Sequence, residues 1–171
     1  EEMTVIGIPL TGICYGKEYA REMGYSYEQL IRKREKATRT FIILNDKERK
    51  KACEEKFIYD KEINGKRIVI VDDTIVRGNV IKAIIRNVRM MGAREVHVRI
   101  PGPPVIDICE LGISIQSKEE LIMNGKTIVE VCEEIGADTL RYLKIEDIEY
   151  FQEESYNQCF TGYIEEGMKK L

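Results

Sequence analysis

The sequence predicts an α/β fold built on a mainly parallel twisted sheet with helices on both faces. Short apolar runs alternate along the chain with segments of helical periodicity, which is the pattern of strands joined through helices. One of these runs, Ile68–Val71, consists of four β-branched residues and is typical of a buried strand. The length of 171 residues is enough for one domain with a substantial core.

In the first third of the chain, Val5–Ile8 predicts a short strand, and Ile13–Met23 predicts a helix that stops at Gly24. The run Thr40–Leu44 predicts a second strand. The segment Asn45–Lys56 that follows is very rich in charged residues, and this composition fits either a helix or a mobile loop.

In the middle of the chain, the turn signal Asn64–Gly65 leads into the strand Ile68–Val71. The segment Asn79–Met91 has apolar residues at helical spacing and predicts a helix that ends at Gly92. The run Glu95–Ile100 predicts another strand. These elements follow the strand, helix, strand order that the fold class requires.

The last third begins with Ser117–Ile122, where Ser117 and Glu120 have the spacing of a capping box and mark the start of a helix. The segment Ile128–Ile135 predicts a helix, Leu140–Leu143 a late strand, and Ile145–Phe151 a last amphipathic helix. The chain contains no internal repeat and no low-complexity linker. We therefore predict a single domain over residues 1–171.

The composition is that of an ordinary globular protein, with 43% hydrophobic residues, 33% charged residues and a net charge of −3. This charge gives no broad basic field for nucleic acid, and no apolar run approaches the roughly 20 residues needed to span a bilayer. The five cysteines form no C-x-x-C pair, so we expect no disulfide framework and a cytoplasmic protein. The single histidine, His97, alternates with Val96 and Val98, which favours a structural role on a strand.

The residues that follow the predicted strand Ile68–Val71 form the strongest candidate site. Two adjacent carboxylates, Asp72 and Asp73, stand at the end of the strand where open α/β sheets bind ligands. They can hold the hydroxyls of a vicinal diol or a hydrated Mg²⁺. The turn Thr74–Asn79 can wrap backbone N–H groups around a phosphate at a helix N-terminus. The pattern predicts a sugar-phosphate site, and the alternative is that Asp73 only caps the turn.

The whole stretch Ile68–Val80, which reads IVIVDDTIVRGNV, resembles the phosphoribosyl-pyrophosphate signature of type I phosphoribosyltransferases. Further matches narrow the resemblance to the phosphoribosyltransferase domain of the glutamine phosphoribosylpyrophosphate amidotransferase family. They occur in that family's order across nearly the whole chain, at Thr38–Ile42, Arg99–Val105, Leu111–Ser114, Lys118–Ile122, Ile135–Leu140 and Cys159–Gly162.

The resemblance implies an enzyme of purine biosynthesis that displaces pyrophosphate from phosphoribosyl pyrophosphate with ammonia to give phosphoribosylamine. In the family, a separate N-terminal glutaminase domain with a cysteine nucleophile releases the ammonia. This chain resembles the synthase half only, so a glutaminase domain or subunit is an expected partner. Purine nucleotides as inhibitors and a homo-oligomer are also expected. Residues 1–171 are then the C-terminal half of a two-domain enzyme, or a stand-alone or divergent form.

The resemblance also assigns roles to individual residues. Asp72 and Asp73 hold the ribose hydroxyls and the cofactor Mg²⁺. The residues that hold the 5′-phosphate are Thr74, Ile75, Val76, Arg77, Gly78 and Asn79. The loop Pro9–Gly12 cradles the pyrophosphate, with Thr11 and Gly12 as its binding residues. The catalytic cations belong to a lid that closes over the substrate, and they are Lys33, Arg39 and Lys56.

Several residues depart from the family's pattern. In the pyrophosphate loop, Leu10 replaces an acidic residue and Gly12 stands where a hydroxyl residue can assist the metal. In the phosphate turn, Asn79 and Val80 replace two threonines. Some family members carry an iron–sulfur cluster, but only Cys109 matches a ligand position and the C-x-x-C pair is missing, so we expect no cluster.

These departures leave four hypotheses open. An active or formerly active phosphoribosyltransferase that uses ammonia is favoured by the retained residues, which are Asp72, Asp73, Thr74, Arg77 and Gly78. A non-catalytic module that keeps the fold and binds phosphoribosyl groups or nucleotides is favoured by the altered residues, which are Leu10, Gly12, Asn79 and Val80. A base-salvaging phosphoribosyltransferase would need an N-terminal hood over the base, and few residues precede Val5. A regulator that senses phosphoribosyl pyrophosphate would need a nucleic-acid surface, which a pI near 5.5 disfavours.

Overall fold

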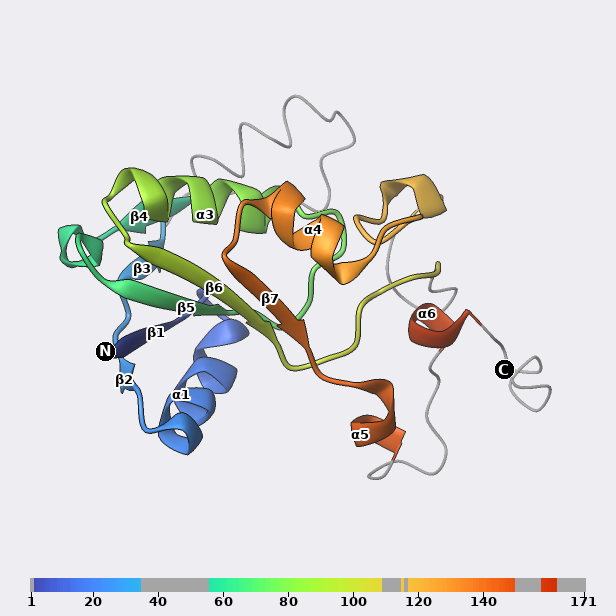
Figure 1. Cartoon of the computed structure of the whole chain (residues 1–171), viewed down its shortest axis with the longest axis horizontal. Helices are drawn as coiled ribbons and strands as arrows, with labels where there is room; N and C mark the ends of the chain where they lie inside the picture. Colours follow the sequence, from blue (N-terminus) through green and yellow to red (C-terminus); the bar gives the residue numbers. More distant parts are fainter. Residues whose placement is uncertain (1, 35–55, 109–114, 116, 150–157, 163–171) are drawn as a thin grey trace.

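A five-stranded parallel sheet forms the centre of the computed structural model, which describes residues 2–34, 56–108, 115, 117–149 and 158–162 (Figure 1). Its strands lie in the order β2-β1-β5-β6-β7, and every neighbouring pair is parallel. The five strands are β1 (Met3–Gly7), β2 (Ser26–Tyr27), β5 (Arg67–Val71), β6 (Glu95–Ile100) and β7 (Thr139–Tyr142). A separate antiparallel ribbon pairs β3 (Ile31–Lys33) with β4 (Phe57–Tyr59).

Helices cover both faces of the sheet, as the sequence predicts. Helix α1 packs on one face, and α3 and α4 pack on the other (Figure 1). The α-helices are α1 (Gly12–Met23), α3 (Asn79–Met90), α4 (Ile128–Ile135), α5 (Ile145–Glu149) and α6 (Gln158–Thr161). The described residues also form the single 3₁₀ turns η2 (Lys61–Ile63) and η3 (Lys118–Glu120). No helix in the described part of the chain is long and apolar enough to cross a membrane.

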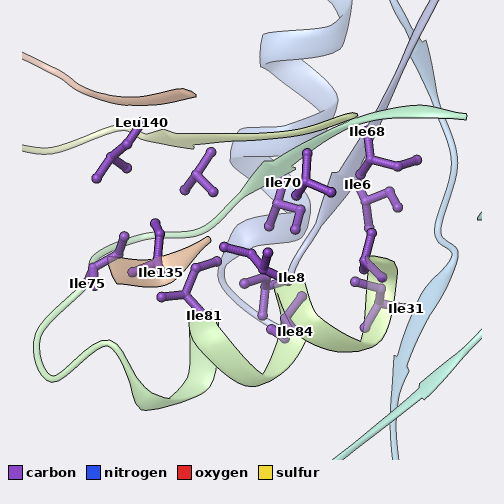
Figure 2. Close-up of a cluster of buried hydrophobic side chains, with 14 of the residues drawn as sticks. Ile6, Ile8, Ile31, Ile68, Ile70, Ile75, Ile81, Ile84, Ile135 and Leu140 are labelled. Carbon is purple, nitrogen blue, oxygen red and sulfur yellow. The ribbon is translucent and has the colours of Figure 1, made fainter. Parts of the chain in front are cut away.

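The main core lies between the sheet and helix α3. Ile68 and Ile70 of β5 face the isoleucines of α3, among them Ile81 and Ile84 (Figure 2). The intervening Val69 and Val71 pack with Ala20 of α1 on the opposite face. Strand β5 is therefore buried on both sides, as expected for the central strand of a parallel sheet. This burial fixes the position of the residues that follow its carboxyl end.

Most predicted elements agree with the structure. Strand β6 and helix α4 have the predicted bounds, and α1 stops at Gly24, which adopts the left-handed conformation with φ of 66°. The short strands β2, β3 and β4 were not predicted, because two or three residues carry no readable periodicity. The predicted strand Thr40–Leu44 and residues 45–55 of the charged segment lie outside the described residues.

The predicted capping box at Ser117 is wrong. Its side chain makes no cap hydrogen bond, and the segment forms only the single turn η3. Glu120 binds Arg77 instead, with 2.6 Å between Oε2 and Nε. The capping box lies ten residues later, at the start of α4. There the amide of Glu130 donates to Thr127 Oγ1 at 3.3 Å, and the amide of Thr127 donates to Glu130 Oε2 at 2.7 Å.

A second, smaller apolar cluster lies beside the turn between β5 and α3. We call it the satellite cluster, and it consists of Val76, Val105, Ile115, Leu121, Cys159 and Phe160. It draws residues from that turn, from the segment after β6, from the residue that follows η3 and from α6. The turn after β5 is thus packed between two cores, because its neighbour Ile75 belongs to the main core.

Candidate functional site

The site forms where β1 and β5 end side by side. Gly7 pairs with Val71 in register, so the loops that leave the two strands start from the same edge of the sheet. A cavity of about 310 Å³ opens between these loops. Its lining consists of Ile8, Pro9, Leu10, Thr11, Lys56 and the continuous run from Asp72 to Ile81. Parallel sheets bind ligands at this edge.

The two carboxylates differ in their surroundings. Asp72 is half-buried, and its amide donates to the carbonyl of Arg99. Burial, followed by the neighbouring charge of Asp73, raises the pKa of Asp72 to about 8. Asp73 is exposed, and its Oδ1 accepts a hydrogen bond from the amide of Thr74 at 2.9 Å. Asp73 therefore does cap the turn, and it also lines the cavity.

These carboxylates fit a magnesium ion. A cation beside Asp72 and Asp73 would offset both their mutual repulsion and the desolvation that disfavours the ionised form. Among the described residues there is no cluster of three or more acidic, histidine or cysteine side chains for a metal. Two carboxylates are nevertheless sufficient for Mg²⁺, which keeps several waters and takes the remaining ligands from a bound phosphate.

The turn after Asp73 is built to hold an anion. The backbone amides of Ile75, Val76 and Gly78 donate to no acceptor within the described residues. Helix α3 starts at Asn79, and its N-terminus has no side-chain cap. These free donors, together with the helix dipole, favour a phosphate group at this position.

Position 78 requires glycine because of its backbone conformation and because of the nearby side chain of Ile122. Its φ is 75°, and a Cβ atom at this position would lie 2.3 Å from Cδ1 of Ile122. Any other residue would be strained there and would displace Ile122 from the main core. The conformation of the turn and its packing against Ile122 therefore require glycine at this position.

Arg77 lines the cavity but is engaged by another residue. Its side chain is only 12% exposed, and its Nε lies 2.6 Å from Oε2 of Glu120. Sequence reasoning assigned Arg77 directly to substrate and missed Glu120. The only available signal was Glu120's place in the segment Lys118–Ile122, one of the matches to the family.

The first loop contains two of the departures from the family, and the structure explains one of them. Gly12 is the first residue of α1 and is buried, and a Cβ atom on it would lie 2.4 Å from the carbonyl oxygen of Val71. A hydroxyl residue has no room there. Gly12 does not line the cavity, whereas Thr11 does. Leu10 is 68% exposed and has a left-handed φ of 90°, which leucine rarely adopts.

The structure brings one of the three predicted catalytic cations to the cavity. Lys56 lines it, and the ammonium group of Lys56 lies 5.2 Å from the centre of the Phe57 ring. Lys33 stands opposite Phe57 in the β3–β4 ribbon and is not among the lining residues. Arg39 lies outside the described residues, as does Cys109, so their predicted roles stay predictions.

His97 has the structural role that its sequence pattern favours. It is buried on β6, and its two ring nitrogens each lie 3.0 Å from a neighbour, Oγ1 of Thr139 and Oε2 of Glu95. Glu95 in turn accepts a hydrogen bond from Nε of Arg67 at 2.8 Å. This network ties three strands together on the face that carries α1, away from the cavity.

The chain is similar in sequence to one part of several proteins named amidophosphoribosyltransferase. No family model matches the chain. The enzyme from Pyrococcus horikoshii is 44% identical over 140 residues, which is 81% of this chain and 31% of that protein. The enzyme from Drosophila melanogaster is 39% identical over 145 residues, 84% of this chain and 27% of that protein. The chain thus spans about a third of the length of these relatives or less.

Solved structures give the same result for the fold. Glutamine phosphoribosylpyrophosphate amidotransferase from B. subtilis, complexed with ADP and GMP, matches with a TM-score of 0.77 and 35% identity, covering 95% of this chain and 38% of that one. A structure described as the allosteric regulatory enzyme of purine biosynthesis matches with a TM-score of 0.79, also at 35% identity, covering 95% and 37%. The predicted fold of a type I phosphoribosyltransferase is confirmed.

Proposed function

We propose, because this chain is homologous to the phosphoribosyltransferase part of amidophosphoribosyltransferase, that it transfers a phosphoribosyl group from phosphoribosyl pyrophosphate to ammonia. The observation that carries the proposal is the cavity at the ends of β1 and β5. It combines the carboxylates of Asp72 and Asp73 with a turn whose free amides lie at the N-terminus of α3. A sugar that carries a phosphate and a metal-bound pyrophosphate needs these features together.

Different residues of the cavity bind different groups of the substrate. Asp72 and Asp73 hold the two ribose hydroxyls and would hold Mg²⁺, which neutralises charge on the departing pyrophosphate. The amides between Ile75 and Asn79 hold the 5′-phosphate. The backbone from Pro9 to Thr11 lies across the cavity and cradles the pyrophosphate. The bond from the anomeric carbon to pyrophosphate oxygen breaks, a bond to ammonia nitrogen forms, and the resulting ammonium group loses a proton to water, so no protein nucleophile is needed.

Lys56 is a second cation of the cavity beside Arg77, and its charge favours a build-up of negative charge on the leaving group. We propose that the ammonia comes from a glutaminase domain or subunit, because the longer relatives extend well beyond the matched region. The B. subtilis structure is complexed with ADP and GMP, and we propose that purine nucleotides bind this chain too. A homo-oligomer is part of the same proposal.

A second candidate function is a non-catalytic module that binds phosphoribosyl groups. The exposed side chain of Leu10 favours it, because an apolar residue at the mouth of the cavity contributes nothing to holding a metal–pyrophosphate complex. In this case the phosphate turn would still bind its ligand, but pyrophosphate would not leave.

Calorimetric titration with phosphoribosyl pyrophosphate and Mg²⁺, followed by an ammonia-dependent assay of pyrophosphate release, separates the two functions. Binding with release supports the transferase, and binding without release supports the module. Asp73→Asn should abolish Mg²⁺-dependent binding while the domain stays folded. The matched control is Asp147→Asn, an exposed aspartate on α5 outside the cavity, which should bind as the unaltered chain does. Absence of binding by the unaltered chain would contradict both functions.

A further inference from the structure

A short segment outside the cavity holds the phosphate-binding turn in place. We call Lys118–Ile122 the support segment. Its residue Glu120 binds Arg77, with 2.6 Å between Oε2 and Nε. Two residues later, the amide of Ile122 donates to the carbonyl of Val76 at 2.8 Å. A side-chain hydrogen bond to Arg77 and a backbone hydrogen bond to Val76 therefore connect the support segment to two neighbouring residues of the turn.

The support segment is itself anchored in both cores. Leu121 packs in the satellite cluster with Val76, and Ile122 packs in the main core against Gly78. At its start, Lys118 Nζ lies 2.8 Å from Oδ2 of the buried Asp107. Residues 120–122 thus contact the turn through a side-chain ion pair, a backbone hydrogen bond and apolar packing. These three kinds of contact restrict the movement of the turn.

The ion pair is well shielded from water. The side chain of Arg77 is 12% exposed and that of Glu120 is 26% exposed. A charge-assisted hydrogen bond in this setting is stronger than one on the surface, and removing one charge leaves the other poorly solvated. With Glu120 neutralised, the guanidinium of Arg77 is held less firmly, and the turn loses one of its contacts with the support segment.

We propose that Glu120 is a positioning residue that acts through Arg77 to keep the amides of the turn in the arrangement that binds the 5′-phosphate. This inference rests on the proposed function. Amides must converge on one anion to bind it, and displacements of about 1 Å in a binding site are costly. Arg77 thereby contributes mainly through its bond to Glu120, and the anion is held by backbone donors.

The test compares two ligands of the same cavity. Ribose 5-phosphate probes the turn, and Mg²⁺-pyrophosphate probes the loop Pro9–Thr11. Calorimetry on Glu120→Gln should show about five- to tenfold weaker binding of ribose 5-phosphate, since a neutral acceptor replaces a charged one. Binding of Mg²⁺-pyrophosphate should change less than twofold. The matched control is Glu119→Gln, which removes the same charge from an exposed neighbour in η3 and should leave both affinities unchanged.

A double-mutant cycle tests the route through the guanidinium. In an Arg77→Leu background, Glu120→Gln should cause no further loss of ribose 5-phosphate affinity. Equal behaviour of Glu120→Gln and Glu119→Gln would overturn the positioning role and leave the proposed function standing. An equal loss for both ligands would overturn it too, because it would indicate general damage to the fold. If the unaltered chain binds neither ligand, the proposed function fails and the positioning role fails with it.

Discussion

Replacing Asp72 by asparagine should make the ligand-free chain more stable at pH 7.5. Burial and the charge of Asp73 raise the pKa of Asp72 from an ordinary 3.8 to about 8. A carboxyl group with a raised pKa in the folded state binds its proton more tightly there than in the unfolded chain. Folding therefore carries no penalty from Asp72 below about pH 4. The penalty grows as the pH rises from about 4 and is complete above about 8.

The size of the effect follows from the same numbers. At about 1.4 kcal/mol per pKa unit, the full rise corresponds to roughly 6 kcal/mol. Asp72 is only half-buried, so water that reaches the carboxylate reduces the penalty. We expect Asp72→Asn to raise the free energy of unfolding by about 1–2 kcal/mol at pH 7.5 and to change it little at pH 4.5. For a domain of this size each 1 kcal/mol shifts the melting temperature by about 2–4 °C.

The assay is thermal unfolding in EDTA at the two pH values. The control is Asp147→Asn, an exposed aspartate whose replacement should change neither melting temperature. Equal melting temperatures for Asp72→Asn and the unaltered chain at pH 7.5 would refute the argument, as would equal stabilisation at both pH values. Adding Mg²⁺ and phosphoribosyl pyrophosphate should reverse the order, because ligand binding stabilises only the form that retains the carboxylate.

Two further substitutions test local geometry by urea unfolding. Thr127→Ala removes the capping box of α4 and should lower the free energy of unfolding by about 1 kcal/mol. Ser117→Ala should have no effect, because the Ser117 side chain makes no cap hydrogen bond. A loss of stability in Ser117→Ala would show that Ser117 does cap this segment. Gly12→Ala places a Cβ atom 2.4 Å from the carbonyl oxygen of Val71 and should lower the free energy of unfolding by about 3 kcal/mol. The control Gly102→Ala meets only an ordinary contact at 3.8 Å and should be tolerated. Equal stability of the two variants would contradict the close approach at Gly12.

The sequence was sufficient to predict the parts of the site that depend on periodicity. A buried strand followed by Asp72, Asp73 and a turn into a helix is a regular pattern, and the structure places it at the edge where a ligand cavity forms. The ends of the helices at Gly24 and Gly136 could be predicted equally well, since a glycine after an amphipathic segment is a local signal of a left-handed C-cap.

The parts that could not be predicted depend on contacts between distant segments. Ser117 and Glu120 have the spacing of a capping box, but Arg77, 43 residues away from Glu120, takes the carboxylate. The raised pKa of Asp72 depends on burial that no local pattern encodes. The left-handed φ of Leu10 runs against the residue's own preference, so only the structure could reveal it.

The close backbone contacts among the end of β1, the start of α1 and the end of β5 limit how this cavity can change. Gly7, Gly12 and the carbonyl of Val71 meet backbone to backbone, with no room for a methyl group between them. At their base, the two walls of the cavity therefore have a separation set by main-chain atoms rather than by side chains. Redesign or divergence of specificity has to use the side chains that project from them, such as Leu10 and Val80.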